Sequence, residues 1–355
     1  MSRLAIQGLG VVGGFGCGVD ALRQALAGAP PTPQPAPAGA GGPLPVLLAA
    51  DDALEDFVPR RALRRVDHFS RLALLGASLA LRDADRLETD RSRLGVVIAT
   101  GWGAMATTFA FLQSFIQGGD VCSSPTHFSS SLHNAAAANI SILLQVTGPS
   151  LTVSQFEMSF PSALLTARRW LAEERVDAVL VGGVDEYCPE LGYCWRRFFG
   201  VADGPLQPLA FDRQSALPGE GAAFVLLERG DRSGRYGYLT AIGQGNLAGS
   251  PPALPQRLLL GADGQKECGA GYPRLLPTGA RVAAYAPAWG SLPVGQAFDL
   301  AAAALAAGDN RLYPAAPAPA GGLELLGGES FGDEPVGCLK LGRCGDYGLL
   351  TVARR

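Results

Sequence analysis

The sequence has few charged residues. Asp, Glu, Lys and Arg make up 17% of its 355 residues, and the formal net charge is −3. A chain without a basic excess lacks the electrostatic footprint of a nucleic-acid-binding protein, so we expect no nucleic-acid partner. A low charged fraction is also typical of a chain that buries much of its surface, which here favours an oligomer interface.

Several other features are missing. No run of 18 or more apolar residues is free of charge, so the sequence predicts no membrane span. The apolar start, MSRLAIQGLGVVGG, is interrupted by glycine and is typical of a strand rather than a leader. The seven cysteines include no CxxC pair, which favours reduced thiols in a cytoplasmic protein without a zinc site. No GxxxxGK[ST] or GxGxxG motif follows a strand, so we expect no cofactor.

The chain is rich in apolar residues, at 48%, and its length is ample for one large domain or two fused halves. Two tracts rich in Pro, Ala and Gly start at Ala29 and Tyr313, and both should be loops. Between them, apolar runs alternate with helical periods, which indicates a layered α/β fold.

The apolar runs predict eight strands, and several are continuous enough to be covered on both faces. The predicted strands are Leu4–Val12, Leu94–Ala99, Ala178–Val181, Ala222–Leu227, Tyr238–Ile242, Val282–Ala286, Val336–Leu341 and Leu349–Ala353. The predicted helices are Val19–Ala27, Ser70–Asp83, Asn134–Gln145, Pro161–Glu174 and Gln296–Ala307. Pro161 suits a first helical position, with Ser159 before it as the expected cap.

A series of motifs follows in a specific order. It runs AIQGLGVVGGFGCGVDALRQALAG, RRVDHFSRLALLGASLALRDA, LGVVIATGWGAM, SSPTHFSSSLHNAAAANIS, GPSLTVSQFEMSF, VDAVLVGGVDEY and LAFDRQSALPGEGAAFVLLER. Over roughly residues 1–230 this series resembles the β-ketoacyl-acyl-carrier-protein synthases. The resemblance implies an α/β thiolase fold, with two similar halves in five layers. We expect an N-terminal half over 1–230 and a shortened C-terminal half over 231–355.

The nucleophile of that family is absent. The family places a cysteine in a TVSTACSSG-like segment, and the matching segment here runs Thr152-Val153-Ser154-Gln155-Phe156-Glu157-Met158-Ser159-Phe160. Glu157 therefore occupies the cysteine position. A thiolate attacks a thioester and leaves again readily, whereas a carboxylate would give a labile mixed anhydride. The resemblance thus implies that no catalytic residue remains.

The two histidines that the family uses in its second half are also missing. All three histidines, His68, His127 and His133, precede Glu157. The sequence predicts that the segment for the first histidine is deleted, with only a Gly/Pro-rich bridge over Leu247–Ala280. The second position aligns with Ser291, in a Trp-Gly-Ser-Leu-Pro-Val-Gly segment that precedes a well-matched helix.

A preserved scaffold without its catalytic groups most resembles the chain length factor, the inactive half of ketosynthase heterodimers in aromatic polyketide and aryl polyene systems. That resemblance implies an active ketosynthase and an acyl carrier protein as partners. Chain length factors commonly carry glutamine at the nucleophile position, so the glutamate is a departure. The shortened second half is more similar to the aryl polyene branch.

Two other functions stay open at this point. The first is a Glu157-dependent decarboxylase, acyl-transfer or hydrolysis enzyme, although an ionised Glu157 about 4 Å from a malonyl carboxylate would repel it by ~4 kcal/mol at an effective dielectric near 20. The second is a homodimer that binds an acyl or aromatic ligand in the old acyl pocket. The structural interpretation of Glu157 is a charge that suits a helix N-terminus, worth ~0.3–1 kcal/mol.

Further candidate residues rest on their positions in the family. Met105, Thr108 and Leu112 share one helix face at the expected dimer axis, where they would narrow a partner's tunnel or serve as core. The interface candidates also include Gln155 and Phe156. The run Arg60, Arg61, Arg64 and Arg65 is either a docking patch for an acidic carrier protein or a solvated face. His133 is interpreted as a packing or capping residue.

Overall fold

The structure is a computed structural model that describes residues 3–39, 41–202, 204–317 and 322–355. Its centre is a mixed sheet that consists of two half-sheets with the same strand order. The first half-sheet has the order β6-β5-β7-β8-β1 and the second β11-β10-β13-β14-β9, with β12 added at its far edge. In each half the first three strands are parallel and the last two antiparallel to their neighbours.

The strands of the first half-sheet are β1 (Leu4–Gly13), β5 (Leu94–Ala99), β6 (Ser150–Val153), β7 (Ala178–Asp185) and β8 (Gly221–Arg229). Those of the second are β9 (Tyr238–Asn246), β10 (Arg257–Leu260), β11 (Arg281–Ala283), β12 (Glu324–Leu325), β13 (Val336–Leu341) and β14 (Asp346–Ala353). A short antiparallel contact between β1 and β9, Leu4 with Leu239 and Ala5 with Tyr238, joins the halves. This repeated topology confirms the predicted fold class, whereas the boundary at residue 230 stays a prediction.

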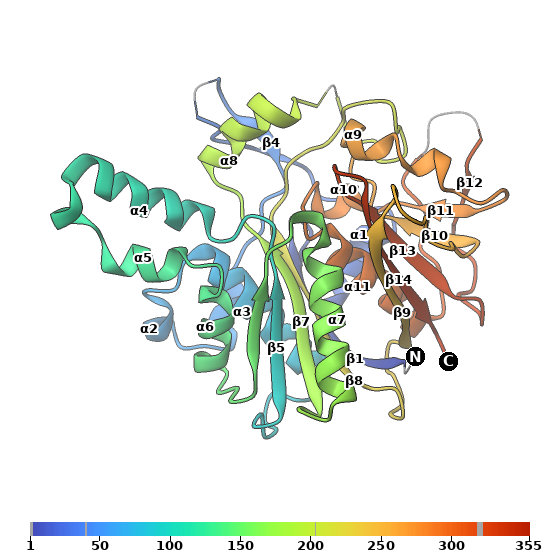
Figure 1. Cartoon of the computed structure of the whole chain (residues 1–355), viewed down its shortest axis with the longest axis horizontal. Coiled ribbons are helices and arrows are strands. Elements are labelled where there is room, and N and C mark those ends of the chain that lie inside the picture. The colour runs from blue at the N-terminus through green and yellow to red at the C-terminus, as the bar shows by residue number, and fades with distance from the viewer. Residues whose placement is uncertain (1–2, 40, 203, 318–321) are drawn as a thin grey trace.

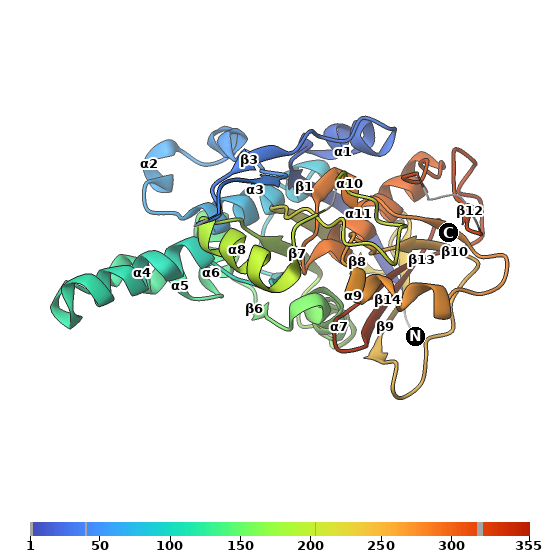
Figure 2. The same ribbon diagram turned by 90° about the horizontal axis from the view of Figure 1, so that it is seen from above.

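Two helices fill the space between the half-sheets. They are α7 (Ser159–Ala172) and α11 (Gly295–Asp309), and each contacts strands of both halves. Helix α11 is apolar on almost every side and buried along most of its length, as expected of a central helix. Outside the first half-sheet lie α3 (His68–Asp83) and α6 (Ala135–Leu143), and outside the second lies the short α9 (Lys266–Gly269) (Figures 1 and 2).

One arm projects from this layered body. It consists of α4 (Met105–Gly118) and α5 (Pro125–Ser131), which extend to one side in Figures 1 and 2. No residue of α4 is buried, although the helix is apolar over most of its length. Helix α8 (Pro189–Cys194) and a following π-helical turn (Trp195–Phe199) lie beside its base. A helix with this composition and no cover is unusual in an isolated globular domain.

The remaining elements lie at the periphery. They are α1 (Val19–Leu26), α2 (Arg60–Leu63), α10 (Ala286–Trp289), β2 (Gly16–Cys17), β3 (Gln34–Ala36) and β4 (Leu44–Val46), with short 3-10 turns between them. The last two strands pair with each other, so the first proline-rich tract is not wholly a loop as predicted. Among the described residues, no helix is both long and apolar enough to cross a bilayer.

Most predicted elements are confirmed, with some corrections. The predicted strand Val282–Ala286 ends at Ala283, because the chain turns at Tyr285 into α10 with Pro287 in its first turn. Six short strands were not predicted: β2, β3, β4, β6, β10 and β12. Ser159 is not the cap of α7 but its first residue, since its hydroxyl bonds the Thr100 carbonyl and the Gln155 N–H instead.

Glycine at position 10 lets β1 lie directly on α3. A Cβ atom there would lie 1.9 Å from the Gly76 carbonyl oxygen and 2.4 Å from the Ala80 nitrogen. We therefore expect Gly10→Ala to lower the free energy of unfolding by about 1–3 kcal/mol through overpacking, measured by urea denaturation. The matched control is Gly327→Ala, where an added Cβ meets no atom within 4 Å. Equal stability of the two variants would contradict this account.

Candidate functional site

The candidate site lies where the central helix α7 begins, between the carboxyl ends of strands from both halves. Strand β6 leads into a 3-10 turn, Phe156–Met158, that carries Glu157 directly before α7. The Phe156 backbone has a φ of 53°, a left-handed conformation that is uncommon for an aromatic residue. The turn presents the half-buried Glu157 carboxylate toward the second half-sheet, where Lys340, Arg343 and Asp263 act on it electrostatically.

The second half supplies a carboxylate that the sequence did not reveal. The segment Leu247–Ala280, predicted as a bridge left by a deletion, contains the central strand β10. Directly after that strand, Asp263 Oδ2 accepts hydrogen bonds from Ser291 Oγ at 2.8 Å and from Lys340 Nζ at 2.9 Å. The predicted deletion was therefore wrong. The segment persists, and its side chain in the site is a carboxylate rather than an imidazole.

The Lys340 ammonium group neutralises the Asp263 carboxylate. It lies on β13, is almost fully buried, and also donates to the Gly261 carbonyl at 2.9 Å. Burial disfavours the ammonium ion, but the attraction of Asp263, Cys268 and Glu157 outweighs burial and raises the pKa of Lys340 above its usual value. The site therefore contains a permanent cation held between acidic groups.

Burial is the main cause of the pKa shifts of two other acids near the site, Glu157 and Asp299. Burial raises the pKa of Glu157 above its usual value, and the nearby Lys340 only partly offsets that effect. Behind the site, on α11, burial raises the pKa of Asp299 to about 7. The protein thus carries a chain of acids and bases through the space between its half-sheets. The Cys268 thiol also lines the cavity beside Glu157, but burial raises the pKa of Cys268 to about 12, so this thiol stays protonated.

The entrance to the site is closed by aromatic side chains. The Phe156 and Trp102 ring centroids are 4.6 Å apart, and Phe199 lies 6.0 Å from Trp102. The Arg343 guanidinium lies 4.0 Å over the Phe199 ring. The cavity that remains beside Glu157, Asp263 and Ser291 is about 20 Å³, enough for a single water and far too small for an acyl chain.

A buried carboxylate holds the loop that forms one wall of the site. Asp185 Oδ1, at the end of β7, accepts from Thr100 Oγ1 at 2.7 Å and from the N–H groups of Gly101 and Trp102. Burial raises the pKa of Asp185 to about 6 despite these bonds. Glu186 next to it accepts from the Ala106 N–H and so fixes the base of α4.

Sequence reasoning identified Glu157 and Ser291 but missed Asp263, Lys340 and Arg343. A signal for Lys340 was present, because the chain has only two lysines and this one interrupts the apolar segment VGCLKL. A lysine inside a buried strand requires an acidic partner nearby. No comparable signal marked Asp263, whose strand is only four residues long and lies in a Gly/Pro-rich region.

The tunnel and interface candidates lie on one side of the site. Met105 and Thr108 are half-buried at the base of α4, and Leu112 is exposed further along. Gln155 is exposed and accepts from Ser162 Oγ at 2.6 Å. The helical spacing of the first three is confirmed, but their role stays a prediction.

The histidines and the basic run take no part in the site. His68 is held between Asp51 at 3.0 Å and Glu220 at 3.2 Å; burial opposes its charge, but these carboxylates raise the pKa of His68 to about 10. His133 is exposed just before α6 and contacts the Gly103 turn. The arginines 60, 61, 64 and 65 are all exposed on and after α2.

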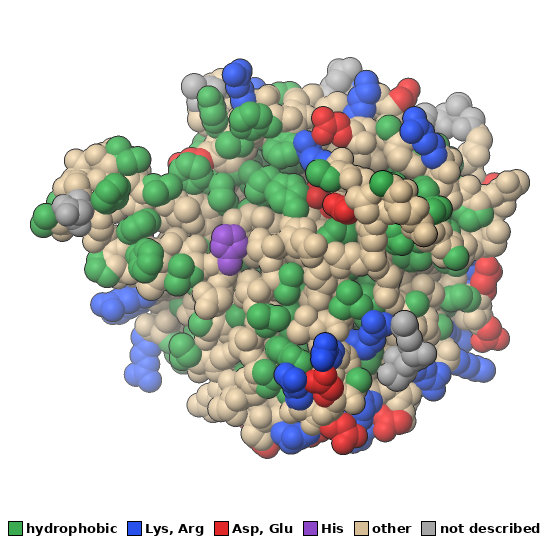
Figure 3. Space-filling model, in the orientation of Figure 1, with side chains coloured by type: hydrophobic (Ala, Val, Ile, Leu, Met, Phe, Trp, Pro, Cys, Tyr) green, Lys and Arg blue, Asp and Glu red, His purple; other side chains and the backbone are tan. Residues whose placement is uncertain are grey.

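A large exposed apolar surface, which we call the apolar face, borders the site. It comprises exposed side chains of the arm, α6, β6, α8 and the segment after it: Leu112, Phe115, Ile116, Val121, Phe128, Leu132, Ile142, Leu151, Tyr193, Phe198 and Val201. Figure 3 shows hydrophobic side chains on the arm and around the hollow beside it. Strand β6 forms the open edge of the sheet in the part of the chain that the structure describes. Such a surface indicates a protein interface.

Comparisons with known proteins agree with this geometry. The family model for the beta-ketoacyl synthase N-terminal domain matches residues 20–233. Nodulation protein E of Rhizobium sp. (strain N33) is 27% identical over 179 residues, which cover 49% of this chain and 44% of the relative. The 3-oxoacyl-[acyl-carrier-protein] synthase 2 of Coxiella burnetii is 27% identical over 240 residues, 64% and 58% of the two chains. The chain thus spans about half the length of these curated relatives.

Solved structures match over nearly the whole chain. The ishigamide ketosynthase/chain length factor matches with a TM-score of 0.80 and 17% identity, covering 99% of both chains. A ketosynthase in complex with its chain length factor from Xenorhabdus doucetiae matches with a TM-score of 0.79 and 16% identity, covering 99% of this chain and 98% of the other. At these identities the matches establish the fold alone.

The pair of Lys340 and Asp263 should control stability. We expect Lys340→Met to lower the free energy of unfolding by about 3–5 kcal/mol, because it leaves a buried carboxylate without its cation. Adding Asp263→Asn to the same chain should recover part of that loss, as read from urea denaturation. The exposed Lys266 provides the control, since Lys266→Met should change stability little. Equal losses for the single and double variants would show that the ion pair is not the cause.

Glu157 should make stability depend on pH. Its pKa is higher in the folded chain than in the unfolded chain, so unfolding releases a proton in the interval between the two values. The contribution of Glu157 to stability is therefore greatest below the ordinary carboxyl pKa of about 4.5 and falls as the pH rises through the raised value. We expect Glu157→Gln to gain stability over the native chain as the pH rises from 4.5, in parallel denaturation series. A constant difference between the two proteins would contradict this.

Proposed function

The chain belongs to the β-ketoacyl synthase family, and on that premise we propose that it is a partner subunit of a ketosynthase heterodimer that does not itself condense. The observation that carries the proposal is the content of the site: Glu157, Asp263 and Ser291 lie around Lys340, the described lining includes no histidine, and its one thiol, Cys268, has a pKa that burial raises to about 12, so that it stays protonated. This is the role of a chain length factor, and we extend it to polyketide or aryl polyene biosynthesis.

The chemistry of the site supports a non-condensing subunit. Condensation needs a nucleophile that forms a thioester and neutral donors that stabilise an enolate. Here the nucleophile position holds a carboxylate, and its neighbour Asp263 is engaged by Ser291 and Lys340. A cavity of about 20 Å³ also leaves no room for an acyl group. The small free volume of the site argues equally against a Glu157-dependent decarboxylase or hydrolase and against an acyl-binding homodimer.

The apolar face supports the proposal that a partner chain binds to this subunit. In the sequence, the only Asp, Glu, Lys or Arg between Leu94 and Phe156 is Asp120. A partner surface must therefore match by shape and apolar contact rather than by charge, which is typical of a permanent interface. The open edge of β6 adds unpaired backbone groups that a second sheet can complete.

The position of the arm suggests how the subunit would shape a product. Met105, Thr108 and Leu112 follow one another along α4, and Gln155 and Phe156 lie near its base. Side chains of this arm would narrow the cavity of the active partner, so that chain length is set across the interface. The exposed arginines after Pro59 would attract an acidic acyl carrier protein by charge.

The proposal predicts that activity needs two chains. The purified chain alone should elongate no acyl-carrier-protein substrate, whereas co-expression with its cognate ketosynthase should give a stable complex that does. Placing a carboxylate in the apolar face with Ile116→Asp should weaken complex formation at least about tenfold, because the charge must be buried without a partner. Size-exclusion chromatography and an elongation assay measure both effects.

The matched control is Leu325→Asp, a similar change at an exposed leucine of β12 outside the apolar face. This variant should assemble normally. Elongation by the lone chain would overturn the proposal. Turnover by the lone chain that disappears in Glu157→Gln would instead support the enzyme hypothesis, and a homodimer that carries a bound acyl or aromatic ligand in native mass spectrometry would support the binding protein.

A further inference from the structure

A second cavity lies at the other end of the first half-sheet from Glu157. It is bordered by the start of β5 at Leu94, the start of β7 at Ala178 and the end of β8 at Arg229. Strand β5 ends at Ala99, next to the Thr100 loop of the candidate site, so its six residues separate the two places by roughly 16–20 Å. The cavity has a volume of about 310 Å³. None of its lining residues belongs to the apolar face, so a bound partner would leave it open.

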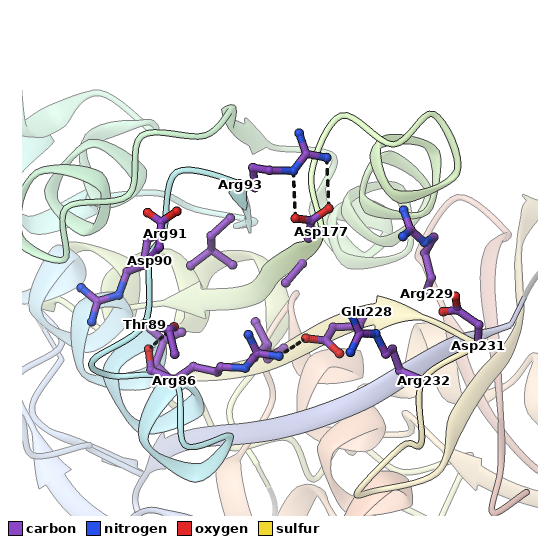
Figure 4. A pocket seen from close by; sticks show the side chains of 14 residues that line it. Arg86, Thr89, Asp90, Arg91, Arg93, Asp177, Glu228, Arg229, Asp231 and Arg232 are labelled. Carbon is purple, nitrogen blue, oxygen red and sulfur yellow. Dashed lines mark hydrogen bonds and ion pairs between the residues drawn. The ribbon is translucent and has the colours of Figure 1, made fainter.

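Arginine dominates the lining of this cavity (Figure 4). Five arginines and four acids surround it: Arg86, Arg91, Arg93, Arg229, Arg232, Asp90, Asp177, Glu228 and Asp231. Such a density of guanidinium groups around one hollow is unusual in a chain with 17% charged residues and a net charge of −3. The question is which of these charges are already satisfied within the protein.

Two of the arginines are fully engaged. Arg93 donates two parallel hydrogen bonds to the Asp177 carboxylate, at 2.8 and 3.0 Å. Arg86 donates to Glu228 at 2.6 Å (Figure 4). These two pairs use up the two acids that come from strand β8 and the start of β7. They form the walls of the cavity. Arg229 and Arg232 act on Asp177 only through longer-range attraction, without a hydrogen bond to it.

The other arginines are under-satisfied. Within the described part of the chain, neither Arg91 nor Arg232 has an ion-pair partner. The Arg91 guanidinium points away from the cavity in Figure 4 and donates to the Leu144 carbonyl, so Arg91 lines the cavity only with its backbone and the start of its side chain. Arg229 has only a 3.6 Å contact with Glu174, a side chain that is 75% exposed.

The two remaining acids do not neutralise these groups. Asp90 accepts hydrogen bonds from the Ser92 N–H at 3.0 Å and from its hydroxyl at 2.6 Å, so both carboxylate oxygens are occupied. Those bonds also lower the pKa of Asp90. Asp231 is exposed at the rim. The cavity therefore presents the guanidinium groups of Arg229 and Arg232, neither of which makes a hydrogen bond to a lining carboxylate in the described part of the chain.

We propose that this cavity binds a small anion that carries a phosphate group. Guanidinium forks match phosphate oxygens in paired hydrogen bonds, and a phosphate monoester offers three acceptor oxygens and up to two charges. A monocarboxylate, with two oxygens, would satisfy only one of the free guanidiniums. A volume of about 310 Å³ is at the lower end for ligand sites, which limits the ligand to a small molecule. This site is independent of the proposed role as a partner subunit.

The test is isothermal titration calorimetry of the purified chain, or of its complex, with inorganic phosphate and with pyrophosphate at low ionic strength. Arg232→Ser and Arg229→Ser should each weaken binding at least about tenfold, because each removes a charge-assisted contact. The matched control is Arg274→Ser, an exposed arginine for which the described residues offer no ion pair. This variant should bind as the native chain does. Circular dichroism of each variant verifies folding.

Four results would contradict the proposed phosphate site. The first is the absence of saturable binding of either probe up to about 10 mM. The second is an equal loss of affinity in Arg274→Ser and Arg232→Ser, which would indicate a general charge effect. The third is binding of a polyglutamate peptide without binding of phosphate, which would assign the arginines to an acidic protein surface. Acetate titrated in parallel distinguishes phosphate from carboxylate ligands, and tighter binding of acetate would also contradict the proposal.

Discussion

The ion pair between Lys340 and Asp263 determines what the space between the two half-sheets can contain. Two charges buried there are tolerable only together, because each alone would carry the full cost of losing water. Their geometry also fixes Ser291, which donates to the same carboxylate oxygen. Once this cluster is in place, the position that carries a nucleophile in catalytic relatives faces a charged, closed wall. The ion pair thus joins strands β10 and β13 of the second half-sheet to the segment that carries Ser291, at the side of the sheet that faces Glu157.

The sequence predicted the parts of the fold in which a local pattern reflects burial. Strands such as Leu94–Ala99 and Val336–Leu341 are continuous apolar runs, and the structure has them with the same bounds. Glu157 and Ser291 were identified because intact motifs surround them. Strand β10 was missed because its four residues lie between proline and glycine, where no periodicity can develop. Asp263 was missed with it.

Contacts between residues far apart in the sequence could not be predicted for a different reason. Lys340 and Asp263 are 77 residues apart, and only the parallel pairing of β10 with β13 brings them together. The arginine cavity likewise combines the end of α3, two strand starts and a strand end, none of which has a motif. The repeated strand order of the halves supplies both sets of contacts, because each half places the same ends of its strands at the same side.

The unburied helix of the arm has a consequence for the biosynthesis of the molecule. Because no residue of α4 is fully buried and only its base contacts the layered body, the body gains little stability from the outer part of the helix. The apolar residues of the arm then stay exposed until a second polypeptide arrives, and in that interval they are suitable targets for a chaperone or a protease. The cellular concentration of this chain would therefore follow the concentration of the polypeptide that covers the arm, so that copies without a partner are degraded and do not accumulate.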